Sequence, residues 1–347
     1  MPAGRKKLRV GLICGGRSGE HDVSLVSARA VAENLDRHKY QVTRMRITRQ
    51  GQWRQDGKPL REVWATLGRL DVVLPILHGP YGEDGTIQGL LEMVGVPYAG
   101  AGVLGSAVAM DKELTKRVWL QAGLPVGPYV RVDKSVWQHT PRHITADIEK
   151  HLRYPLFVKP ANMGSSVGIS KVKRRSQLSA AIDLAAAYDT KMVVEQGLDA
   201  RELECSVLGN HEPTASAPGE VLPGREFYDY AAKYAQAGSR TLIPAPLPAK
   251  VTRRVSDLAL AAFQAVECQG LARVDFFLER RTGRIYLNEI NTMPGFTSIS
   301  MYPKLWEAAG LPFPKLLDRI IALALERANE RRALGHPIGE KRVAISV

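Results

Sequence analysis

Apolar runs of strand length alternate with helical stretches over about the first 115 residues of the 347-residue chain. Short strands are expected at residues 9–13, 41–47, 71–76 and near 97–99. An Ala-rich helix that ends near Leu35 follows the first strand, and another helix is expected at 86–94. This order predicts a small α/β layer built on a parallel sheet.

A second α/β unit is expected after the Gly- and Pro-rich stretch 123–128, which interrupts the helical pattern and indicates a boundary. Its predicted strands, 155–159 and 192–195, flank a Gly/Ser loop and a helix at 176–188. Residues 220–248 show little periodicity, so we expect a long loop there, of the kind that often acts as a lid. Further helices are expected at 251–269 and 314–331, the last with a buried apolar face.

The segments 271–278 and 285–291 both have the composition of strands, and the Gly-containing turn 280–284 separates them. A β-hairpin is the simplest interpretation. Pairing of Glu279 with Ile285 across the turn would set its register. On one face it would place these pairs opposite each other: Phe277 with Leu287, Asp275 with Glu289, and Arg273 with Asn291.

The pair of Asp275 and Glu289 predicts a bound cation. Two carboxylates directly opposite each other on a sheet, with β carbons about 5 Å apart, repel one another unless positive charge lies between them. Oxygen ligands without cysteine or histidine favour Mg²⁺ or Mn²⁺, and Mg²⁺ is commonly held by one or two carboxylates together with substrate phosphates. The hairpin therefore indicates a magnesium–nucleotide site. The alternative is a solvated strand face on which Arg273 neutralises the two acids.

The composition is that of a folded protein with two or three domains. The chain has 45% hydrophobic and 24% charged residues, and it is too long for one small core. No apolar run approaches the ~20 residues needed to cross a bilayer, and the apolar segment 10–13 is too short for a signal peptide. Cys14, Cys205 and Cys268 match no disulfide framework and no zinc spacing. We therefore expect a cytoplasmic protein without a membrane partner.

The formal net charge of +13 admits a nucleic acid, a membrane surface or a phosphorylated ligand as partner. The basic residues are dispersed, with their densest runs at 5–7, 171–175 and 327–342. These runs contain no interleaved aromatic residues and no recognisable nucleic-acid-binding module. Solvated faces and a frayed C-terminal tail are therefore expected, and no nucleic acid.

Three Gly-rich loops follow predicted strands. In residues 159–168, Lys159 precedes the loop of small residues, which suits a mobile flap over phosphates rather than a Walker loop. The loop 14–24 lacks the Gly-x-Gly-x-x-Gly spacing, and its Glu20 suits an ammonium group better than an anion. The loop 78–85 begins with His78, and a lone histidine is more often structural. Taken singly, a Gly/Ser turn such as 159–168 is more often only a turn.

Taken together and in this order, the motifs closely resemble the D-alanine:D-alanine ligase family of the ATP-grasp superfamily. The resemblance covers about residues 10–325. Its motifs are the loop with Glu20, the His78 loop, 110–112, Lys159 with 164–168, Glu195, Glu202, 228–234, 273–275 and 288–295. Each motif alone is common, but the whole set at compatible spacing is not.

The resemblance implies an α/β and α+β fold, in which an N-terminal Rossmann-like (pre-ATP-grasp) domain precedes a two-subdomain ATP-grasp fold. We expect a substrate-binding N-terminal domain at 1–118 and a central subdomain with the phosphate flap at 119–208. A C-terminal subdomain at 209–347 would carry the lid loop and the Mg²⁺ site. The family also suggests a homodimer formed through the N-terminal domain.

The resemblance also implies how ATP and metal are bound. Two Mg²⁺ ions, for which Mn²⁺ can substitute, would be held by Asp275, Glu289 and Asn291. The implied ATP contacts are Lys112, Lys159 and Ser166 with the phosphates, Glu195, Gln196 and Leu198 with adenine, Glu202 with the ribose hydroxyls, and Lys233 on the lid with the γ-phosphate.

The implied reaction joins two D-alanines at the expense of ATP, for peptidoglycan precursor synthesis. One D-alanine carboxylate attacks the γ-phosphate to form a D-alanyl phosphate, which the amine of the second D-alanine then attacks. The tetrahedral oxyanion needs preorganised donors, which the resemblance assigns to Arg273 and the Gly295 N–H.

Six further residues have implied roles at the substrates and the lid. Glu20 would bind the ammonium of the first substrate, and His78 would lie near its carboxyl group. Ser300 and Met301 would receive the carboxylate of the second substrate. Ser165 would link Glu20 to Tyr234 in a hydrogen-bonded trio that closes the lid.

Two alternatives stay open. The same fold can join D-alanine to D-lactate or D-serine, but relatives that accept D-lactate tend to lack a tyrosine at the position of Tyr234, which favours the dipeptide. Many relatives have leucine where this chain has Met301, a mild apolar change. The other alternative is a basic RNA- or membrane-binding protein on a degenerate ATP-grasp scaffold. Lys159 and the residues assigned to the metal are intact in this chain, which argues against this second alternative. Salt-sensitive RNA binding without ATP turnover would support it.

Overall fold

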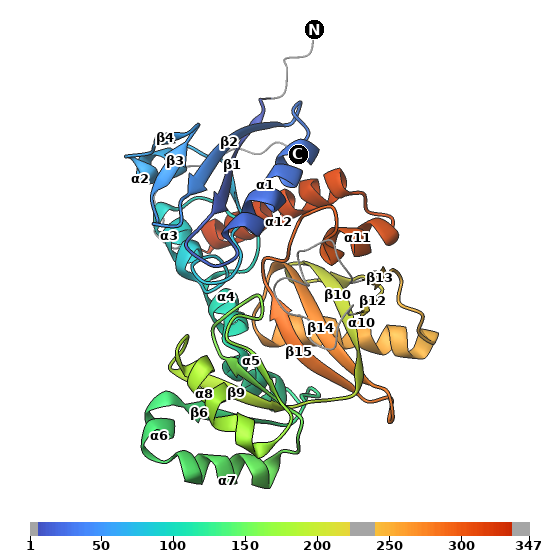
Figure 1. Cartoon of the computed structure of the whole chain (residues 1–347). Coiled ribbons are helices and arrows are strands. Elements are labelled where there is room, and N and C mark those ends of the chain that lie inside the picture. Colours follow the sequence, from blue (N-terminus) through green and yellow to red (C-terminus); the bar gives the residue numbers. More distant parts are fainter. Residues whose placement is uncertain (1–5, 223–239, 335–347) are drawn as a thin grey trace.

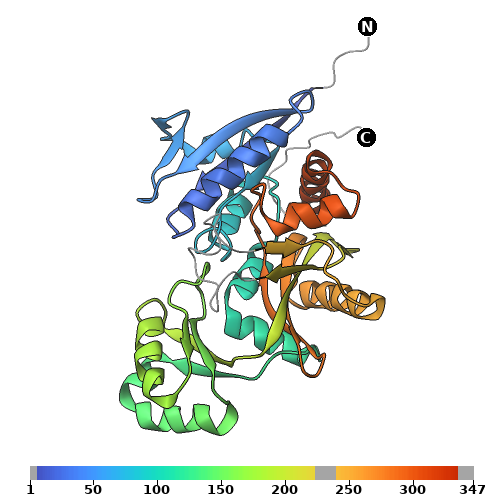
Figure 2. The same ribbon diagram turned by 45° about the vertical axis from the view of Figure 1, so that its right-hand side comes forward.

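The computed structural model describes residues 6–222 and 240–334, which form three sheets with helices packed on them. Figure 1 shows the N-terminal sheet in blue at the top, the central sheet in green at the bottom, and the C-terminal sheet in yellow and orange beside them. The teal helices that follow the N-terminal sheet lie between the other two sheets in Figure 1 and in Figure 2. The expected mixture of α/β and α+β units is confirmed.

The N-terminal sheet has the spatial order β4-β3-β2-β1-β5. Its strands are β1 (Leu8–Gly15), β2 (Tyr40–Ile47), β3 (Trp53–Gln55), β4 (Lys58–Pro59) and β5 (Val72–Pro75). As expected, β1 pairs in parallel with β2 and β5, whereas β3 and β4 add an antiparallel edge. The strand expected near 97–99 is only a single bridge between Val73 and Tyr98, because the chain turns away at Gly100.

Helices cover both faces of this sheet and lead on to the rest of the chain. They are α1 (His21–Asn34), α2 (Val63–Leu67), α3 (Thr86–Val94), α4 (Val103–Met110) and α5 (Lys112–Gln121). Side chains alternate along β1, so Val10 and Leu12 enter the core shared with α1, while Ile13 enters the core beneath α2 and α3. Burial on both faces explains why the parallel strands are apolar runs.

The central sheet is antiparallel and has the order β6-β9-β7-β8. Its strands are β6 (Tyr129–Asp133), β7 (Leu156–Pro160), β8 (Ser170–Val172) and β9 (Lys191–Gln196). Its helices are α6 (Lys134–His139), α7 (Pro141–His151) and α8 (Leu178–Ala186), the last preceded by a 3₁₀ turn, Arg175–Gln177. The Gly/Ser flap connects β7 to β8, so it projects from the end of the sheet where Lys159 lies.

The C-terminal sheet has the order β13-β12-β10-β14-β15, and β11 pairs with β10. Its strands are β10 (Ala200–Gly209), β11 (Thr214–Ala215), β12 (Gly219–Leu222), β13 (Arg240–Leu242), β14 (Gly270–Glu279) and β15 (Ile285–Asn291). Its helices are α10 (Ala249–Ala265), α11 (Met301–Ala308) and α12 (Phe313–Ala333).

The weak periodicity of the segment 220–248 predicted one continuous loop, and this prediction is wrong. β12 and β13 lie at either side of residues 223–239, which fall outside the described residues, and the two strands pair antiparallel. Val221 packs against Met301 and Leu305 of α11, and this apolar contact stabilises β12. The interpretation missed these strands because four residues or fewer carry too little pattern.

The predicted hairpin is present as β14 and β15. Between Asp275 and Phe276 the ladder shifts by one residue. Two predicted pairs lie on the near side of this shift and are confirmed: Asp275 with Glu289, and Arg273 with Asn291.

The rest of the predicted register is wrong. Phe276, and not Phe277, lies opposite Leu287, and Ile285 pairs with Leu278 instead of Glu279. The shift is a β-bulge, and it turns Phe276 and Leu287 together into the buried core. Packing of these two side chains explains why the bulge lies directly beside the acidic pair.

The C-terminal helix α12 completes the N-terminal core. It lies beside α1 in Figure 1, and its apolar face shares a core with β1, β5 and α1. Burial of each large apolar side chain there contributes about 1.5–3 kcal/mol. The buried face expected for this helix is confirmed: Leu316, Leu317, Ile320, Ile321, Leu323 and Ala324 are all buried, whereas Leu325 is partly buried.

Arg327 on α12 is buried, contrary to the expectation of a solvated basic tail. Its Nη1 donates to the Gly100 carbonyl, and its Nη2 donates to the Tyr98 carbonyl at 2.8 Å. The guanidinium also lies over the Tyr98 ring, 4.5 Å from its centroid. One arginine therefore joins the C-terminal helix to residues 98–100, which its sequence neighbours could not reveal.

The three cysteines are free thiols, as their spacing predicted. In the ranges 6–222 and 240–334, none of the helices has the length and apolar character that a membrane crossing requires.

Candidate active site

A cavity of about 690 Å³ opens between the central sheet, the C-terminal sheet and loops of the N-terminal sheet. Its volume is in the range usual for small-molecule sites, roughly 300–1,000 Å³. The residues expected at the site that line it are Glu20, His78, Lys112, Lys159, Ser165, Ser166, Glu195, Gln196, Leu198, Glu202, Arg273, Asp275, Glu289, Asn291 and Gly295. Ser300 and Met301 are described but do not line it, and Lys233 and Tyr234 fall outside the described residues.

Arg273 and Asp275 form a buried bidentate pair on β14. Arg273 Nε and Nη2 donate to the two carboxylate oxygens of Asp275 at 2.7 and 2.6 Å, and Nε also lies 3.1 Å from Glu204 Oε2. The exposed fractions of Arg273 and Asp275 are 9% and 8%. The alternative of a solvated strand face is therefore wrong, although Arg273 does neutralise one of the acids.

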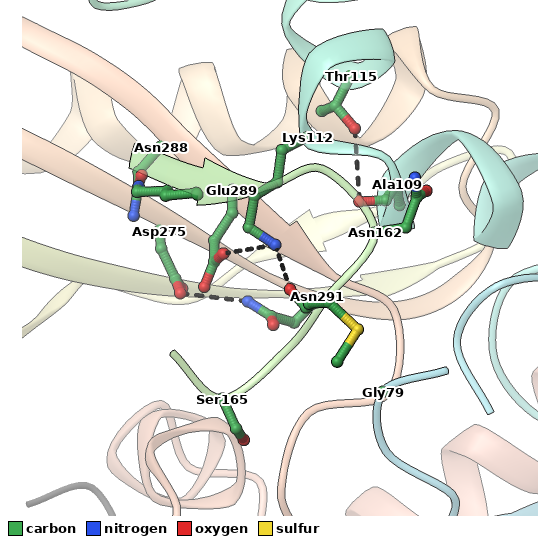
Figure 3. Close-up of polar contacts among 12 residues, drawn as sticks. Gly79, Ala109, Lys112, Thr115, Asn162, Ser165, Asp275, Asn288, Glu289 and Asn291 are labelled. Carbon is green, nitrogen blue, oxygen red and sulfur yellow. Dashed lines mark hydrogen bonds and ion pairs between the residues drawn. The ribbon is translucent and has the colours of Figure 1, made fainter. Parts of the chain in front are cut away.

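Negative charge is in excess around this pair. Burial raises the pKa of Asp275 to about 7; Arg273 opposes the rise, and the carboxylates of Glu204 and Glu289 add to it. Asn291 Nδ2 donates to Asp275 Oδ2 at 3.1 Å, so an amide also faces the acid (Figure 3). A bound cation would offset the repulsion among the carboxylates.

Asp275, Glu289 and Asn291 supply the hard oxygen donors that Mg²⁺ prefers. Figure 3 shows these three side chains close together and next to Lys112. In the part of the chain that the structure describes, no three His, Cys, Asp or Glu side chains gather as a metal-binding group. Two carboxylates and an amide fit an ion that completes its coordination with substrate phosphates and water.

Lys112 connects three parts of the site. Its Nζ donates to the Met163 carbonyl of the flap at 2.6 Å and lies 3.9 Å from Glu289 Oε2 (Figure 3). Lys112 is the first residue of α5, and the side chain of Asp111 caps that helix by accepting a hydrogen bond from Leu114 N at 2.9 Å. The arrangement can hold an anion between the flap and the acidic hairpin.

Glu195 on β9 lies between two lysines. Lys159 Nζ donates to Glu195 Oε2 at 2.7 Å, and Lys116 Nζ lies 3.1 Å from Glu195 Oε1. Burial raises the pKa of Glu195, but Lys116 and Lys159 lower it more, to about 2. The sequence analysis missed Lys116, although its spacing of four residues from Lys112 places both on one helix face.

Glu20 and Ser165 are in contact across the cavity. The Ser165 hydroxyl donates to Glu20 Oε1, and both side chains are buried. A Cβ at Gly79 or at Gly164 would come within 2.5 or 2.6 Å of Glu20 Oε2, so a larger residue at either position would displace the end of the Glu20 side chain. Ser165 and Ser166 have φ of +50° and +60°, left-handed conformations that cost about 1–3 kcal/mol each. Two members of the expected trio are thus joined.

His78 has protein partners at both ring nitrogens. Nδ1 lies 2.8 Å from the Met293 carbonyl, and Nε2 lies 3.1 Å from Ser27 Oγ. A carbonyl can only accept, so Nδ1 carries the proton and Nε2 accepts from the serine hydroxyl. Burial lowers the pKa of His78 and favours this neutral ring.

Gln196 and Leu198 line the cavity at the segment that joins the central and C-terminal sheets. Gln196 Oε1 accepts a hydrogen bond from the backbone N–H of Arg153 at 3.1 Å. Glu202 follows on β10, and Glu204 is two residues further along the same face. That spacing is the signal that could have revealed Glu204, which the sequence analysis missed.

Ser300 and Met301 lie next to the cavity wall. Ser300 Oγ accepts from Thr297 N at 3.0 Å, and a Cβ at Gly295 would come within 2.7 Å of that oxygen. Met301 packs with the apolar cluster under β12. Ser300 is therefore beside Gly295, whereas the side chain of Met301 belongs to the core.

The geometry defines a class of protein. Two α+β units meet at one cavity, with a lysine and a Gly/Ser flap on one side and an acidic hairpin on the other, and this is the arrangement of an ATP-grasp enzyme. The family described as "D-ala D-ala ligase C-terminus" matches residues 118–322, and the family described as "D-ala D-ala ligase N-terminus" matches 9–66 and 60–101. The chain belongs to the D-alanine–D-alanine ligase family.

Curated relatives agree over nearly the whole chain. The D-alanine–D-alanine ligase of Solibacter usitatus is 53% identical over 326 residues, which cover 94% of this chain and 98% of that protein. The D-alanine–D-alanine ligase of Heliobacterium modesticaldum is 48% identical over 354 residues, which cover 94% of this chain and 97% of that protein.

Solved structures give the same result. The D-alanine-D-alanine ligase of Coxiella burnetii superposes with a TM-score of 0.80 at 36% identity, covering 95% of this chain and 97% of that one. The VanG D-Ala:D-Ser ligase of Enterococcus faecalis superposes with a TM-score of 0.83 at 35% identity. The match covers 92% of this chain and 100% of that one. The family resemblance, the fold class and the class of ATP-dependent ligase expected from the sequence are confirmed.

Proposed function

We propose that this protein joins two D-alanines to D-alanyl-D-alanine at the expense of ATP, and so supplies a peptidoglycan precursor. One observation carries the proposal: the Glu20–Ser165 pair, Lys112 and the Arg273–Asp275 pair come from three parts of the chain and face one cavity. An ammonium site, a phosphate site and a charged site for the reacting carbonyl are what an amino-acid ligase needs in one place.

ATP would lie between the central and C-terminal sheets. The assignments are Lys112, Lys159, Ser166 and Lys233 for the phosphates, Glu195, Gln196 and Leu198 for adenine, and Glu202 for the ribose hydroxyls. The position of Lys112 between the flap and Glu289 supports its phosphate role. The contact of Lys159 with Glu195 supports a role of both residues in ATP binding, because the carboxylate would orient the lysine toward the nucleotide.

Two Mg²⁺ ions, or Mn²⁺ in their place, would be held by Asp275, Glu289 and Asn291 together with the phosphates. Bound Mg²⁺ supplies charge neutralisation on the transferring phosphoryl group. The donor set and the excess of carboxylates around Arg273 support this assignment.

The residues of the chain would act on the two substrates as follows. Glu20 holds the ammonium of the first D-alanine, whose carboxylate oxygen attacks the γ-phosphorus and displaces ADP. The amine of the second D-alanine, as its free base, attacks the acyl carbon of the D-alanyl phosphate. Arg273 and the Gly295 N–H stabilise the tetrahedral oxyanion, which collapses with loss of phosphate.

The second substrate would bind at the start of α11. Ser300 is the residue before this helix and Met301 is its first residue, so the unpaired N–H groups of the first turn suit a carboxylate. Ser300 also lies beside Gly295, which puts this carboxylate next to the reacting carbonyl. His78 is assigned near the carboxyl group of the first substrate.

Phosphate release with a single amino acid tests the proposal, and the product formed from D-alanine mixed with a second substrate tests its specificity. We expect release with D-alanine and none with L-alanine. D-serine and D-lactate are the alternatives within the family, since VanG is a D-Ala:D-Ser ligase. An amine nucleophile needs its free base, so ligation should rise with pH, whereas a hydroxyl nucleophile such as D-lactate would be preferred at lower pH. More D-alanyl-D-lactate or D-alanyl-D-serine than D-alanyl-D-alanine from such a mixture would overturn the D-alanyl-D-alanine assignment.

Three further expectations are kept as proposals: cytoplasmic location, a homodimer and the domain divisions after 118 and 208. The exposed apolar side chains of Met93 on α3 and Leu104 on α4 support an interface on the N-terminal domain, and sedimentation equilibrium tests it. The three separate sheets support a division into three units. The division after 118 falls within α5, and the division after 208 would separate most of β10 from the C-terminal sheet, in which it pairs with β14.

A further inference from the structure

Glu83 joins two loops that are 210 residues apart in the chain. Its Oε2 accepts a hydrogen bond from Gly79 N at 2.7 Å, within the loop 78–85. Its Oε1 accepts a hydrogen bond from Met293 N at 3.0 Å, in the segment that follows β15. One carboxylate therefore ties the N-terminal domain to the segment that contains Gly295.

The backbone carbonyl of the same residue, Met293, is held by His78. The ring Nδ1–H donates to the Met293 carbonyl at 2.8 Å, so both backbone polar groups of Met293 are bound by the loop 78–85. A third tie follows at Phe296, whose backbone N–H donates to Ser27 Oγ at 3.2 Å. The Ser27 hydroxyl in turn donates to Nε2 of His78 at 3.1 Å.

These ties lie on both sides of Gly295. Met293 precedes this glycine by two residues and Phe296 follows it directly, so the segment 293–296 is fixed at both ends by N-terminal side chains. A hydrogen-bond donor aimed at an oxyanion is effective only when it is held in place before charge develops. A displacement of about 1 Å at such a donor lowers the rate by roughly 10²-fold.

We propose that Glu83 is a positioning residue of this ligase, which together with His78 and Ser27 aims the Gly295 N–H at the reacting carbonyl. The inference rests on the proposed function of the cavity. It also gives His78 a role that its contacts explain, because both ring nitrogens are engaged in holding the segment.

The neighbouring Asp84 offers a matched control. Its carboxylate also accepts two backbone hydrogen bonds, from Tyr81 N at 2.8 Å and from Thr86 N at 3.0 Å. Tyr81 belongs to the same loop as Asp84, and Thr86 is the first residue of α3. Glu83→Gln and Asp84→Asn therefore make the same chemical change in adjacent residues, and only the first removes an acceptor that faces the segment 293–296.

The test compares overall ligation with acyl phosphate formation. For Glu83→Gln we expect kcat for D-alanyl-D-alanine to fall about 10- to 100-fold, because the amide nitrogen cannot accept one of the two N–H groups. The KM for ATP should change less than about 2-fold, since the ATP contacts lie elsewhere. In Glu83→Gln, hydroxylamine should still trap D-alanyl phosphate at most of the rate seen with the unaltered protein. Asp84→Asn should leave kcat, the KM for ATP and the trapping rate unchanged.

A kcat for Glu83→Gln within about 2-fold of the unaltered protein would overturn the positioning role, and so would an equal loss in Asp84→Asn. If the unaltered protein releases no phosphate with D-alanine, it is the proposed function that fails, which the same assay distinguishes. Should Glu83→Gln not fold, as judged by circular dichroism, Ser27→Ala carries the same expectation through the Phe296 tie. Normal kcat in a folded Ser27→Ala would then overturn the inference.

Discussion

Arg273 and Asp275 lie two residues apart on β14 and share two hydrogen bonds of 2.7 and 2.6 Å. Alternation along the strand puts both side chains on the face that lines the cavity. The cation assigned to the oxyanion and the acid assigned to the metal are therefore one buried pair. A change to either residue alters the charge that the other one experiences, so the two roles are coupled.

Arg273→Ala should lower kcat for dipeptide formation about 10²- to 10³-fold and change the KM for D-alanine much less, because the guanidinium acts mainly on the transition state. The kcat of Arg273→Lys should lie between those of Arg273→Ala and the unaltered protein, since an ammonium group keeps the charge but cannot form the bidentate contact. Steady-state phosphate release measures both. Arg319→Ala, at an exposed ion pair with Glu326, is the control. A rise in KM alone would contradict the oxyanion assignment.

Glu289→Gln should abolish D-alanine-dependent ADP release and leave the fold intact. Glutamine keeps the size of the side chain but removes the charge that Mg²⁺ requires. The measurements are ADP release over a Mg²⁺ titration and far-UV circular dichroism. Glu279→Gln, at the far end of the same hairpin, should behave as the unaltered protein. Near-normal turnover of Glu289→Gln at ordinary Mg²⁺ concentrations would refute the metal role.

Glu195 should make stability depend on pH in the acid range. Its pKa is about 2 in the folded protein and about 4.3 in an unfolded chain, so the folded state binds fewer protons between these values. By linkage, its stabilisation is complete above about pH 5 and is lost as the pH falls toward 2.

Glu195→Gln should therefore lower the free energy of unfolding at pH 7 by on the order of 3–5 kcal/mol, because it leaves two buried lysines without their counter-ion. The difference from the unaltered protein should shrink as the pH falls below about 4.5. Thermal melts between pH 3 and 8 measure it. Asp22→Asn, at an exposed pair with Arg49, should show no such difference. A gap for Glu195→Gln that does not narrow in acid would contradict the assignment.

Arg327→Met should lower the free energy of unfolding by at least about 2 kcal/mol, since it leaves the buried Gly100 and Tyr98 carbonyls without their donor. Urea denaturation measures the change as a lower midpoint. Arg319→Met on the same helix is exposed and should have little effect. A midpoint for Arg327→Met equal to that of the control would show that the contact of α12 with residues 98–100 does not stabilise the fold.

The pairing of Asp275 with Glu289 could be predicted because strand side chains repeat every two residues and a short turn sets the register. The β-bulge beside that pair could not be predicted from the sequence. It depends on how Phe276 and Leu287 pack under α10, and a local pattern contains no information on that neighbour. In the same way, the four-residue spacing of Lys112 and Lys116 is visible in the sequence, but the contact of Lys116 with Glu195 depends on how α5 lies against β9.

Local patterns and motifs in a fixed order were enough to predict most strands and helices, the Gly-rich loops, the acidic hairpin and the family, because each depends on residues close together in the chain. They did not predict the short strands β12 and β13. Only the packing of distant segments buried Arg327 and brought Glu83 and His78 to the backbone N–H and the carbonyl of Met293. These contacts join residues more than 200 positions apart. Their geometry comes from the packing of three sheets around shared cores, and no local periodicity encodes it.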